Sequence, residues 1–182
     1  MSDLTPHQQC LLKKLFSPEN VERLTSLIEG STEKEWEGIS AALLDQESAN
    51  AAIVYVDGAS ELENSNAGIG GIFFNSADSE KEIYSFSENI GAATNNEAEY
   101  RALLRALEIG QELNINKLDI RSDSELLVKQ INLEYKVKNE RLQELHAEAR
   151  DRLAGIEWSL SHVRREKNKK ADILSKQALA KR

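Results

Sequence analysis

The chain has 182 residues, of which 40% are hydrophobic and 30% charged, a composition typical of a globular protein that buries a core. Its single cysteine, Cys10, excludes an intramolecular disulfide and a zinc site made only of cysteines. We expect a cytoplasmic protein without a membrane segment, because no apolar run reaches about 18 residues and the first residues lack a secretory signal. The net charge of -8 would repel nucleic acid as a whole, so the position of the basic residues matters.

Residues 1–50 contain both prolines and carry nine acidic and four basic side chains. Start signals at Thr5-Pro6, at Ser17-Pro18 and at Thr32 with Glu35 predict three short helices. Fifty residues form a marginal core alone, so we expect this segment to dock on the rest of the chain, on a second copy in a homodimer, or on a protein partner. Its role is unknown, and it contains no chemistry-bearing motif.

From residue 51 the hydrophobic periodicity changes to that of strands alternating with helices. The pattern predicts strands at 52–57, 68–74, 82–87, 117–122 and 156–162, and helices at 94–113, 126–131, 142–153 and 168–181. This order, βββαβααβα, favours an α/β fold with a mixed five-stranded sheet flanked by helices. We therefore expect two domains, a helical extension over 1–50 and a catalytic domain over 51–182.

Two of the expected strands are followed by an aspartate. Asp57 ends a run of five apolar residues, and Asp123 lies between a strand and a helix. Taken alone, Asp57 is equally well explained as the start of a turn, and Asp123 as a helix N-cap, a role that Ser122 or Ser124 would also suit. Because open α/β sheets bind ligands at the carboxyl ends of their strands, the recurrence favours a functional pair.

The helix that starts at Thr94 contains two glutamates with different expected roles. Glu97 completes a capping box with Thr94 and shares a solvated face with Arg101. Glu99 shares the apolar face of the helix. A carboxylate on such a face is either half-buried and paired or a metal ligand, so Glu99 is the candidate functional residue.

The last part of the chain combines an acid, a histidine and most of the basic charge. Asp172 lies in the early turns of the last helix, which Asn168 is placed to cap, and a helix-dipole acid is the simpler explanation. His162 ends the last strand, where a structural histidine is the common case. From His162 onward there are eight basic and two acidic side chains, so this segment is a basic patch or a solvated helix face.

Four acids at strand ends and helix starts, without a cluster of Cys or His, favour hard cations such as Mg²⁺ or Mn²⁺. Two such ions would activate water and stabilise the leaving oxygen in phosphodiester hydrolysis. The chain has no GxxxxGK[ST] phosphate loop and no GxGxxG spacing, which disfavours nucleoside triphosphate and dinucleotide binding.

The sequence pieces that carry these residues occur in a fixed order: Tyr55-Val-Asp57-Gly-Ala-Ser60, Thr94-Asn-Asn-Glu-Ala-Glu99-Tyr, Arg121-Ser-Asp123-Ser, and His162 with Asn168-Lys-Lys-Ala-Asp172. Over about residues 51–180 they resemble the type 1 ribonuclease H family. The resemblance implies a ribonuclease H-like fold and cleavage of the RNA strand of RNA–DNA hybrids by two metal ions, leaving a 3′-hydroxyl and a 5′-phosphate.

Carried over residue by residue, the resemblance also implies the roles of the site. The metal-binding catalytic acids fall on Asp57, Glu99, Asp123 and Asp172, with two Mg²⁺ ions, or Mn²⁺, per site. His162 matches the family's mobile histidine, thought to help deprotonate water or release product. Contacts with the substrate fall on Ser60, Asn95, Asn96 and Lys138, with the two asparagines in the minor groove of the hybrid.

The chain departs from the family pattern in two places. The segment 131–140 is too short for the basic, aromatic-rich protrusion of some members, so hybrid affinity rests on Lys136, Lys138 and the basic C-terminal segment. Residues 1–50 are acidic and do not resemble the hybrid-binding domain of other members.

Two other functions fit parts of the sequence. One is a different nuclease of the same fold, a 3′–5′ exonuclease or a resolvase-like DNA nuclease, against which the order of the acids and the Asn95-Asn96 pair argue. The other is a catalytically silent domain that binds nucleic acid or protein, which the presence of all four acids disfavours.

Overall fold

The computed structural model describes residues 14–44, 51–61 and 66–180. Contacts between residues divide the chain into two compact units, Met1–Ala49 and Asn50–Arg182. None of the helices in the described ranges has the length and apolar character needed to cross a bilayer.

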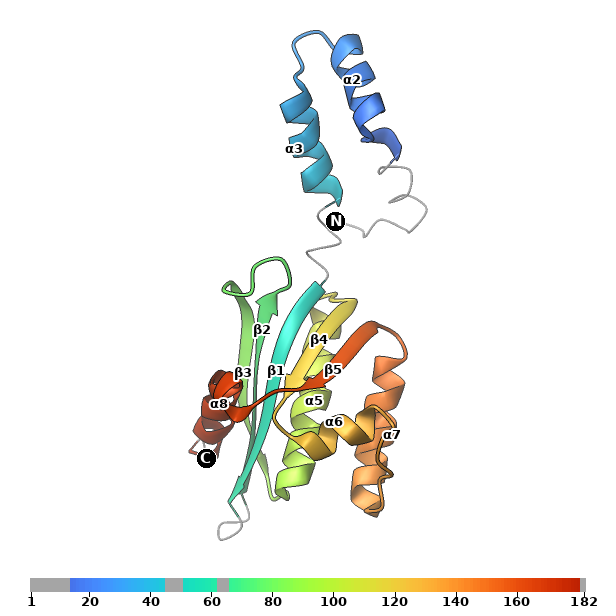
Figure 1. Ribbon diagram of the computed structural model, residues 1–182. Coiled ribbons are helices and arrows are strands. Elements are labelled where there is room, and N and C mark those ends of the chain that lie inside the picture. Colours follow the sequence, from blue (N-terminus) through green and yellow to red (C-terminus); the bar gives the residue numbers. More distant parts are fainter. Residues whose placement is uncertain (1–13, 45–50, 62–65, 181–182) are drawn as a thin grey trace. The chain divides into compact units, whose positions relative to one another are not determined.

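The first unit contains two described helices that run side by side, α2 (Pro18–Leu27) and α3 (Glu33–Leu44) (Figure 1). The turn between them uses Gly30 at a φ of +86°, a conformation that suits glycine. A capping box starts α3, since the Glu35 carboxylate accepts from the Thr32 backbone N–H at 2.8 Å and the Thr32 hydroxyl accepts from the Glu35 N–H at 3.3 Å. The helix predicted from Thr5 lies outside the described residues.

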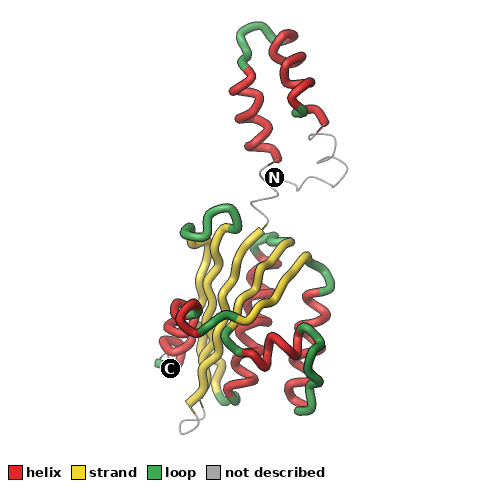
Figure 2. Tube along the Cα trace, in the orientation of Figure 1, coloured by secondary structure: helices red, strands yellow, loops and turns green. Residues whose placement is uncertain are grey.

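The second unit is built on one five-stranded sheet with the order β3-β2-β1-β4-β5 (Figure 2). Its strands are β1 (Ala51–Glu61), β2 (Asn66–Asn75), β3 (Glu82–Gly91), β4 (Lys117–Ser122) and β5 (Glu157–His162). The pairs β1–β2 and β2–β3 are antiparallel, whereas β1–β4 and β4–β5 are parallel. The predicted mixed sheet and the order βββαβααβα are therefore confirmed.

Helices cover the two faces of this sheet unequally (Figure 1). One face carries α5 (Asn95–Glu112), α6 (Glu125–Ile131) and α7 (Glu140–Leu153), which share a buried core with the sheet. The other face carries α8 (Lys169–Leu179), which contacts β1, β2 and β3 and follows the short 3-10 helix η1 (Arg165–Lys167).

The main core lies between the sheet and α5, because β1 and α5 each present an apolar face to the other. Val54 and Val56 of β1 and Leu103 of α5 are fully buried there. The alternation of β1 places its even-numbered residues on this face and its odd-numbered residues, including Asp57, on the α8 face. The strand that bears the first acid is thus fixed by burial on both sides.

Two glycines let helices approach the sheet more closely than any other residue would allow. A Cβ on Gly58 would lie 2.3 Å from the backbone of Ala98 in α5, and a Cβ on Gly70 would lie 2.3 Å from the Ser175 nitrogen in α8. Both helices therefore approach the sheet beside the end of β1 that carries Asp57.

Candidate active site

Three parallel strands end in register, and this alignment brings two acids together. The last β1–β4 pair is Val56 with Ser122, and the last β4–β5 pair is Ser122 with His162. Asp57 and Asp123 each follow the last residue of their strand in the parallel β1–β4 pairing, although β1 continues to Glu61 in its pairing with β2. Carboxyl ends of parallel strands form the ligand-binding edge of open α/β sheets, so the register alone places both acids at that edge.

Glu99 joins them from the first turn of α5. Thr94 caps this helix, and the predicted capping box with Glu97 is present. Since residue 58 has no side chain, the α5 backbone at Ala98 and Glu99 packs directly against β1, and the Gly58 backbone hydrogen-bonds the Glu99 carboxylate. This contact fixes Glu99 beside Asp57.

The carboxylates of Asp57, Glu99 and Asp123 form a compact anionic cluster. Each offers an oxygen, and these oxygens lie within 4.8 Å of one another. Asp57 and Glu99 are both 94% buried, and Glu99 Oε2 has no hydrogen-bond partner among the described residues. Buried carboxylate oxygens without partners are costly unless a cation compensates them, and oxygen donors are what Mg²⁺ and Mn²⁺ prefer. The donor set therefore fits a hard divalent metal.

The pKa values of the cluster reflect the cost of assembling it. Burial, followed by the charges of Asp123 and Asp172, raises the pKa of Asp57 to about 7, against a lowering contribution from the Ser175 hydrogen bond. Burial and then the charges of Asp57 and Asp123 raise the pKa of Glu99 well above its usual range. Both shifts have the direction expected where carboxylates converge without a compensating cation.

Two buried polar side chains, one immediately before α8 and one within it, hold the aspartates in place. Asn168 Nδ2 donates to Asp123 Oδ1 at 2.7 Å and to the Val56 carbonyl at 3.0 Å. The Ser175 hydroxyl donates to Asp57 Oδ2. Neither residue has measurable solvent exposure. α8 thus orients two members of the cluster from the opposite side of the sheet to α5.

Asp123 is available to the cluster because another residue caps the next helix. The Ser124 hydroxyl accepts from the Leu127 N–H, so of the three capping candidates in the sequence it is Ser124 that caps α6. Asn168 is the N-cap residue of α8, as expected, but its side chain does not cap the helix. Its amide is used by Asp123 and Val56, and it makes no capping hydrogen bond.

Asp172 lies near the cluster but has cationic partners of its own. Its oxygens pair with Arg165 at 2.8 Å and with Lys176 at 2.7 Å. Burial acts to raise the pKa of Asp172, but the hydrogen bonds from Lys176 and Arg165 outweigh it and lower this pKa below its usual value. Asp172 still raises the pKa of Asp57 through its charge, so it borders the three-carboxylate cluster without belonging to it in this structure.

The other predicted site residues lie on the surface around this edge of the sheet. His162 is exposed at the end of β5. Asn95 and Asn96 are exposed in the first turn of α5. Ser60 is half-buried on β1 opposite Ala67, and Lys138 is exposed before α7. None of these five is among the residues that form the carboxylate cluster.

Sequence reasoning differed from the structure at Glu97 and did not identify Ser175. Glu97 is 8% exposed, rather than solvated, and its ion-pair partner is Arg141 of α7 at 3.7 Å. Arg141 comes from a distant helix, which local spacing does not reveal. The one signal for Ser175 is its place on the buried face of α8, where a hydroxyl needs a partner.

Comparison with known proteins gives consistent matches to this unit. Residues 55–178 match the family model described as reverse transcriptase-like. The chain is 34% identical over 126 residues to a ribonuclease HI of Halobacterium salinarum, covering 69% of this chain and 62% of that protein. It is 32% identical to a bifunctional protein of Mycobacterium tuberculosis, covering 70% of this chain and 35% of that protein. The chain thus spans less than two thirds of these curated relatives.

Two solved structures are similar over nearly their whole length. The ribonuclease H1 of Halobacterium salinarum has a TM-score of 0.69 at 32% identity, covering 72% of this chain and 99% of that one. The LC11 ribonuclease H1, solved in complex with an RNA/DNA hybrid, has a TM-score of 0.66 at 34% identity, covering 71% of this chain and 97% of that one.

Proposed function

Because the chain belongs to the reverse transcriptase-like family and, within it, to the type 1 ribonucleases H, we propose that it is an endonuclease that hydrolyses the RNA strand of RNA–DNA hybrids. The observation that carries this proposal is the cluster of Asp57, Glu99 and Asp123, with its buried, unpartnered Glu99 oxygen. A similar protein, the LC11 ribonuclease H1, has been solved with an RNA/DNA hybrid, which supports the substrate class.

In this proposal Asp57, Glu99, Asp123 and Asp172 hold two Mg²⁺ ions, with Mn²⁺ as an alternative. When bound, such ions supply an activated water and stabilise the leaving oxygen, which gives 3′-hydroxyl and 5′-phosphate products. Asn168 and Ser175 keep the carboxylates of Asp123 and Asp57 oriented for this chemistry. Their hydrogen bonds use one oxygen of each carboxylate and leave the other for a cation.

The surrounding residues have roles in substrate binding and proton transfer. His162, exposed beside the strand ends, takes up a proton from the attacking water or assists product release. Asn95 and Asn96 contact the minor groove, where the RNA strand displays its 2′-hydroxyls. Ser60 and Lys138 bind the backbone together with the basic segment from His162 onward, which offsets the overall negative charge.

The direct test is cleavage of an end-labelled RNA–DNA hybrid by the full chain, with Mg²⁺ and with a chelator. We expect internal cuts in the RNA strand only, and only with metal. Asp123→Asn removes a charged ligand from the cluster and should abolish cleavage. Asp119→Asn is the matched control, because Asp119 lies on the same strand and pairs with Arg121. Loss of activity in the control, or cleavage without metal, would contradict the proposal.

The same assay separates the two other functions. A 3′–5′ exonuclease would shorten single-stranded DNA from its end, and a silent binding domain would retain the hybrid uncut. The exposed Asn95-Asn96 pair beside the carboxylates favours a nuclease that reads the minor groove of a hybrid, so neither is the preferred function.

A further inference from the structure

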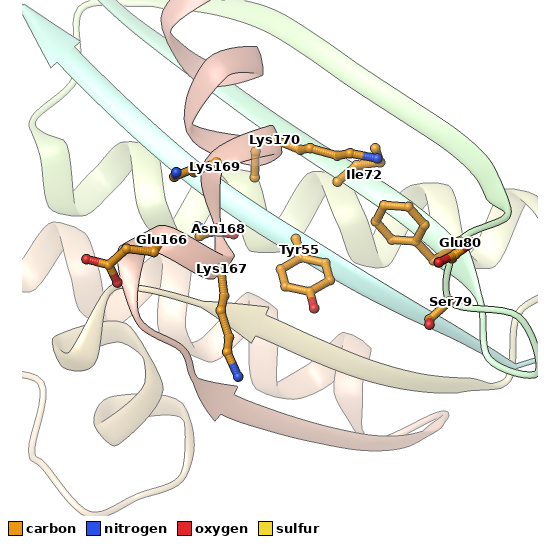
Figure 3. A pocket seen from close by; sticks show the side chains of 11 residues that line it. Tyr55, Ile72, Ser79, Glu80, Glu166, Lys167, Asn168, Lys169 and Lys170 are labelled. Carbon is orange, nitrogen blue, oxygen red and sulfur yellow. The ribbon is translucent and has the colours of Figure 1, made fainter.

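A cavity of about 400 Å³ lies where the start of α8 meets β1, β2 and the β2–β3 turn (Figure 3). Tyr55, Ile72 and Phe74 from the strands and Lys167, Asn168 and Lys170 from the start of α8 line it. Its volume is within the range of about 300–1,000 Å³ that is usual for small-ligand pockets. The roles assigned above leave the cavity itself without a function.

The floor of the cavity is aromatic. The rings of Tyr55 and Phe74 pack edge to face with centroids 6.0 Å apart. Cations already stack on both rings, since Lys170 Nζ lies 4.8 Å from the Phe74 centroid and the Arg121 guanidinium lies 5.3 Å from the Tyr55 centroid. Because the two rings are nearly perpendicular, a nucleobase can stack on the face of one ring at a time, with cationic groups beside it.

The charge around the cavity is uneven. Lys167 and Lys170 extend on the two sides of the Tyr55 ring, whereas Glu166 and Lys169 lie on the far side of the α8 start (Figure 3). Glu80, in the β2–β3 turn, is at the other end of the cavity. The side with Lys167 therefore suits an anion. On the other side the Lys170 amino group lies over Phe74, and the Glu80 carboxylate can accept a hydrogen bond from an amino group.

Asn168 connects this cavity to the carboxylate cluster. It lines the cavity, is fully buried and donates to Asp123 Oδ1, while its own Oδ1 has no partner among the described residues. Tyr55 lies two residues before Asp57 and on the same face of β1. A nucleic-acid strand at the carboxylate cluster therefore passes close to the cavity.

We propose that this cavity binds one unpaired nucleotide of a single strand that extends from the hybrid. The base stacks on the Tyr55 ring with its amino edge toward Glu80, and the phosphate lies near Lys167. Lys170 lies beside the base, over the perpendicular Phe74 ring. A paired base is held in the helical stack and does not enter a cavity, so the ligand is the single-stranded part. Nucleotide binding here is independent of the proposed function, whereas the preference for an extended hybrid rests on it.

The test is equilibrium binding of the full chain, in a chelating buffer that prevents cleavage, to a blunt labelled hybrid and to the same hybrid with a short single-stranded extension. Extensions are placed on either strand and at either end. We expect one extension to strengthen binding roughly tenfold, the effect of a stacked base. The double variant K167A/K170A should bind blunt and extended hybrids equally. K117A, which removes a lysine paired with Glu157, should keep the preference.

A second arm separates a strand end from a free nucleotide. Adenosine monophosphate is titrated into the labelled protein, and amide signals of residues 167–171 are followed by nuclear magnetic resonance. One outcome is that the nucleotide shifts these amide signals in the unchanged protein but not in K167A/K170A, while an extension has no effect on hybrid binding. That result would support the site, with a free nucleotide rather than a strand end as its ligand. Neither shifts nor an extension effect would overturn the site. Absence of hybrid cleavage, with binding to the cavity intact, would overturn only the proposed function.

Discussion

At the scale of single residues, the site depends on which of two neighbouring glutamates faces the sheet. Glu97 and Glu99 are two positions apart on α5, yet one completes a capping box and the other contributes an unpartnered buried oxygen. The difference arises from the 3.6-residue helical repeat, which turns positions two apart toward different sides. Chemically identical side chains therefore have separate roles.

We predict that Glu99→Gln abolishes hybrid cleavage, because a hard divalent cation loses a charged ligand. The fold should be kept or stabilised, since burial already disfavours the charged form of this side chain. Glu97→Gln is the matched control. Glutamine still accepts from Thr94, and loss of the 3.7 Å pair with Arg141, whose side chain is exposed, should cost no more than about 0.5 kcal/mol. Single-turnover cleavage rates test both variants, with circular dichroism to confirm that they fold. An active Glu99→Gln and an inactive Glu97→Gln would refute the assignment of Glu99 as the metal ligand.

We predict that Ser175→Ala weakens Mg²⁺ binding without unfolding the protein. The Ser175 hydrogen bond lowers the pKa of Asp57, so its loss moves that pKa further above about 7 and reduces the ionised, metal-binding fraction at neutral pH. Calorimetric titration with Mg²⁺ near neutrality should show weaker binding, and the deficit should shrink as pH rises. A deficit that does not depend on pH would indicate a packing role alone.

At the scale of elements, the order and type of the five strands and four α-helices described after residue 51 could be predicted from periodicity and capping signals, whereas the 3-10 helix η1 was not predicted. Strand lengths could not, because β1 and β2 form a long antiparallel ribbon whose glycine-rich half shows no apolar alternation. The sequence predicted Asp57 and Asp123 from the ends of the expected strands, and Glu99 from its place on the apolar face of the expected helix. The roles of Asn168 and Ser175 were missed, since they depend on how α8 docks on the sheet, and that docking joins residues more than a hundred positions apart.

The docking of α8 leads to a prediction for Gly70. Gly70→Ala places a methyl group 2.3 Å from the Ser175 nitrogen, so α8 must move away from β2. Overpacking of this kind typically costs about 1–3 kcal/mol, and we expect reduced Mg²⁺ affinity as well because Ser175 moves. Gly155→Ala is the control, with its nearest neighbour at 3.9 Å. Denaturant unfolding and Mg²⁺ titration measure both effects, and equal behaviour of the two variants would contradict this account.

At the scale of the whole molecule, the carboxylate cluster links stability to pH and to metal. The pKa of Asp57 rises from 3.8 to about 7 on folding, so between these values the folded protein holds a proton that the unfolded chain has released. We therefore predict that the free energy of unfolding of the metal-free protein falls as pH rises through this window. Mg²⁺ binds the folded state and should restore stability above it.

Thermal unfolding from about pH 4 to about pH 8, with chelator and with Mg²⁺, tests this linkage. Asp57→Asn is the informative variant, because it lacks the titrating group and should lose part of the pH dependence. A metal-free protein whose melting temperature rises steadily across the window would contradict the raised pKa.

The division into two compact units leads to a prediction about the first one. Every residue proposed here for the chemistry lies in Asn50–Arg182, so we expect a fragment of residues 51–182 to fold and to cleave a hybrid. Circular dichroism and the labelled-hybrid assay are the measurements. A folded fragment that has lost cleavage would show that residues 1–50 contribute to activity.

The position of α8 in the chain also determines when the carboxylate cluster acquires its hydrogen-bond partners during synthesis. A chain made only as far as β5 already carries Asp57, Glu99 and Asp123, but lacks Asn168 and Ser175, which orient two of them. The glycine-lined face of β2 that receives α8 is then uncovered. Translation runs from the N-terminus, so the hydrogen bonds that orient the carboxylate cluster form only after α8 has been made and docked. A ribosome that stalls before α8 therefore leaves a chain in which Asp57 and Asp123 lack the two side chains that orient them.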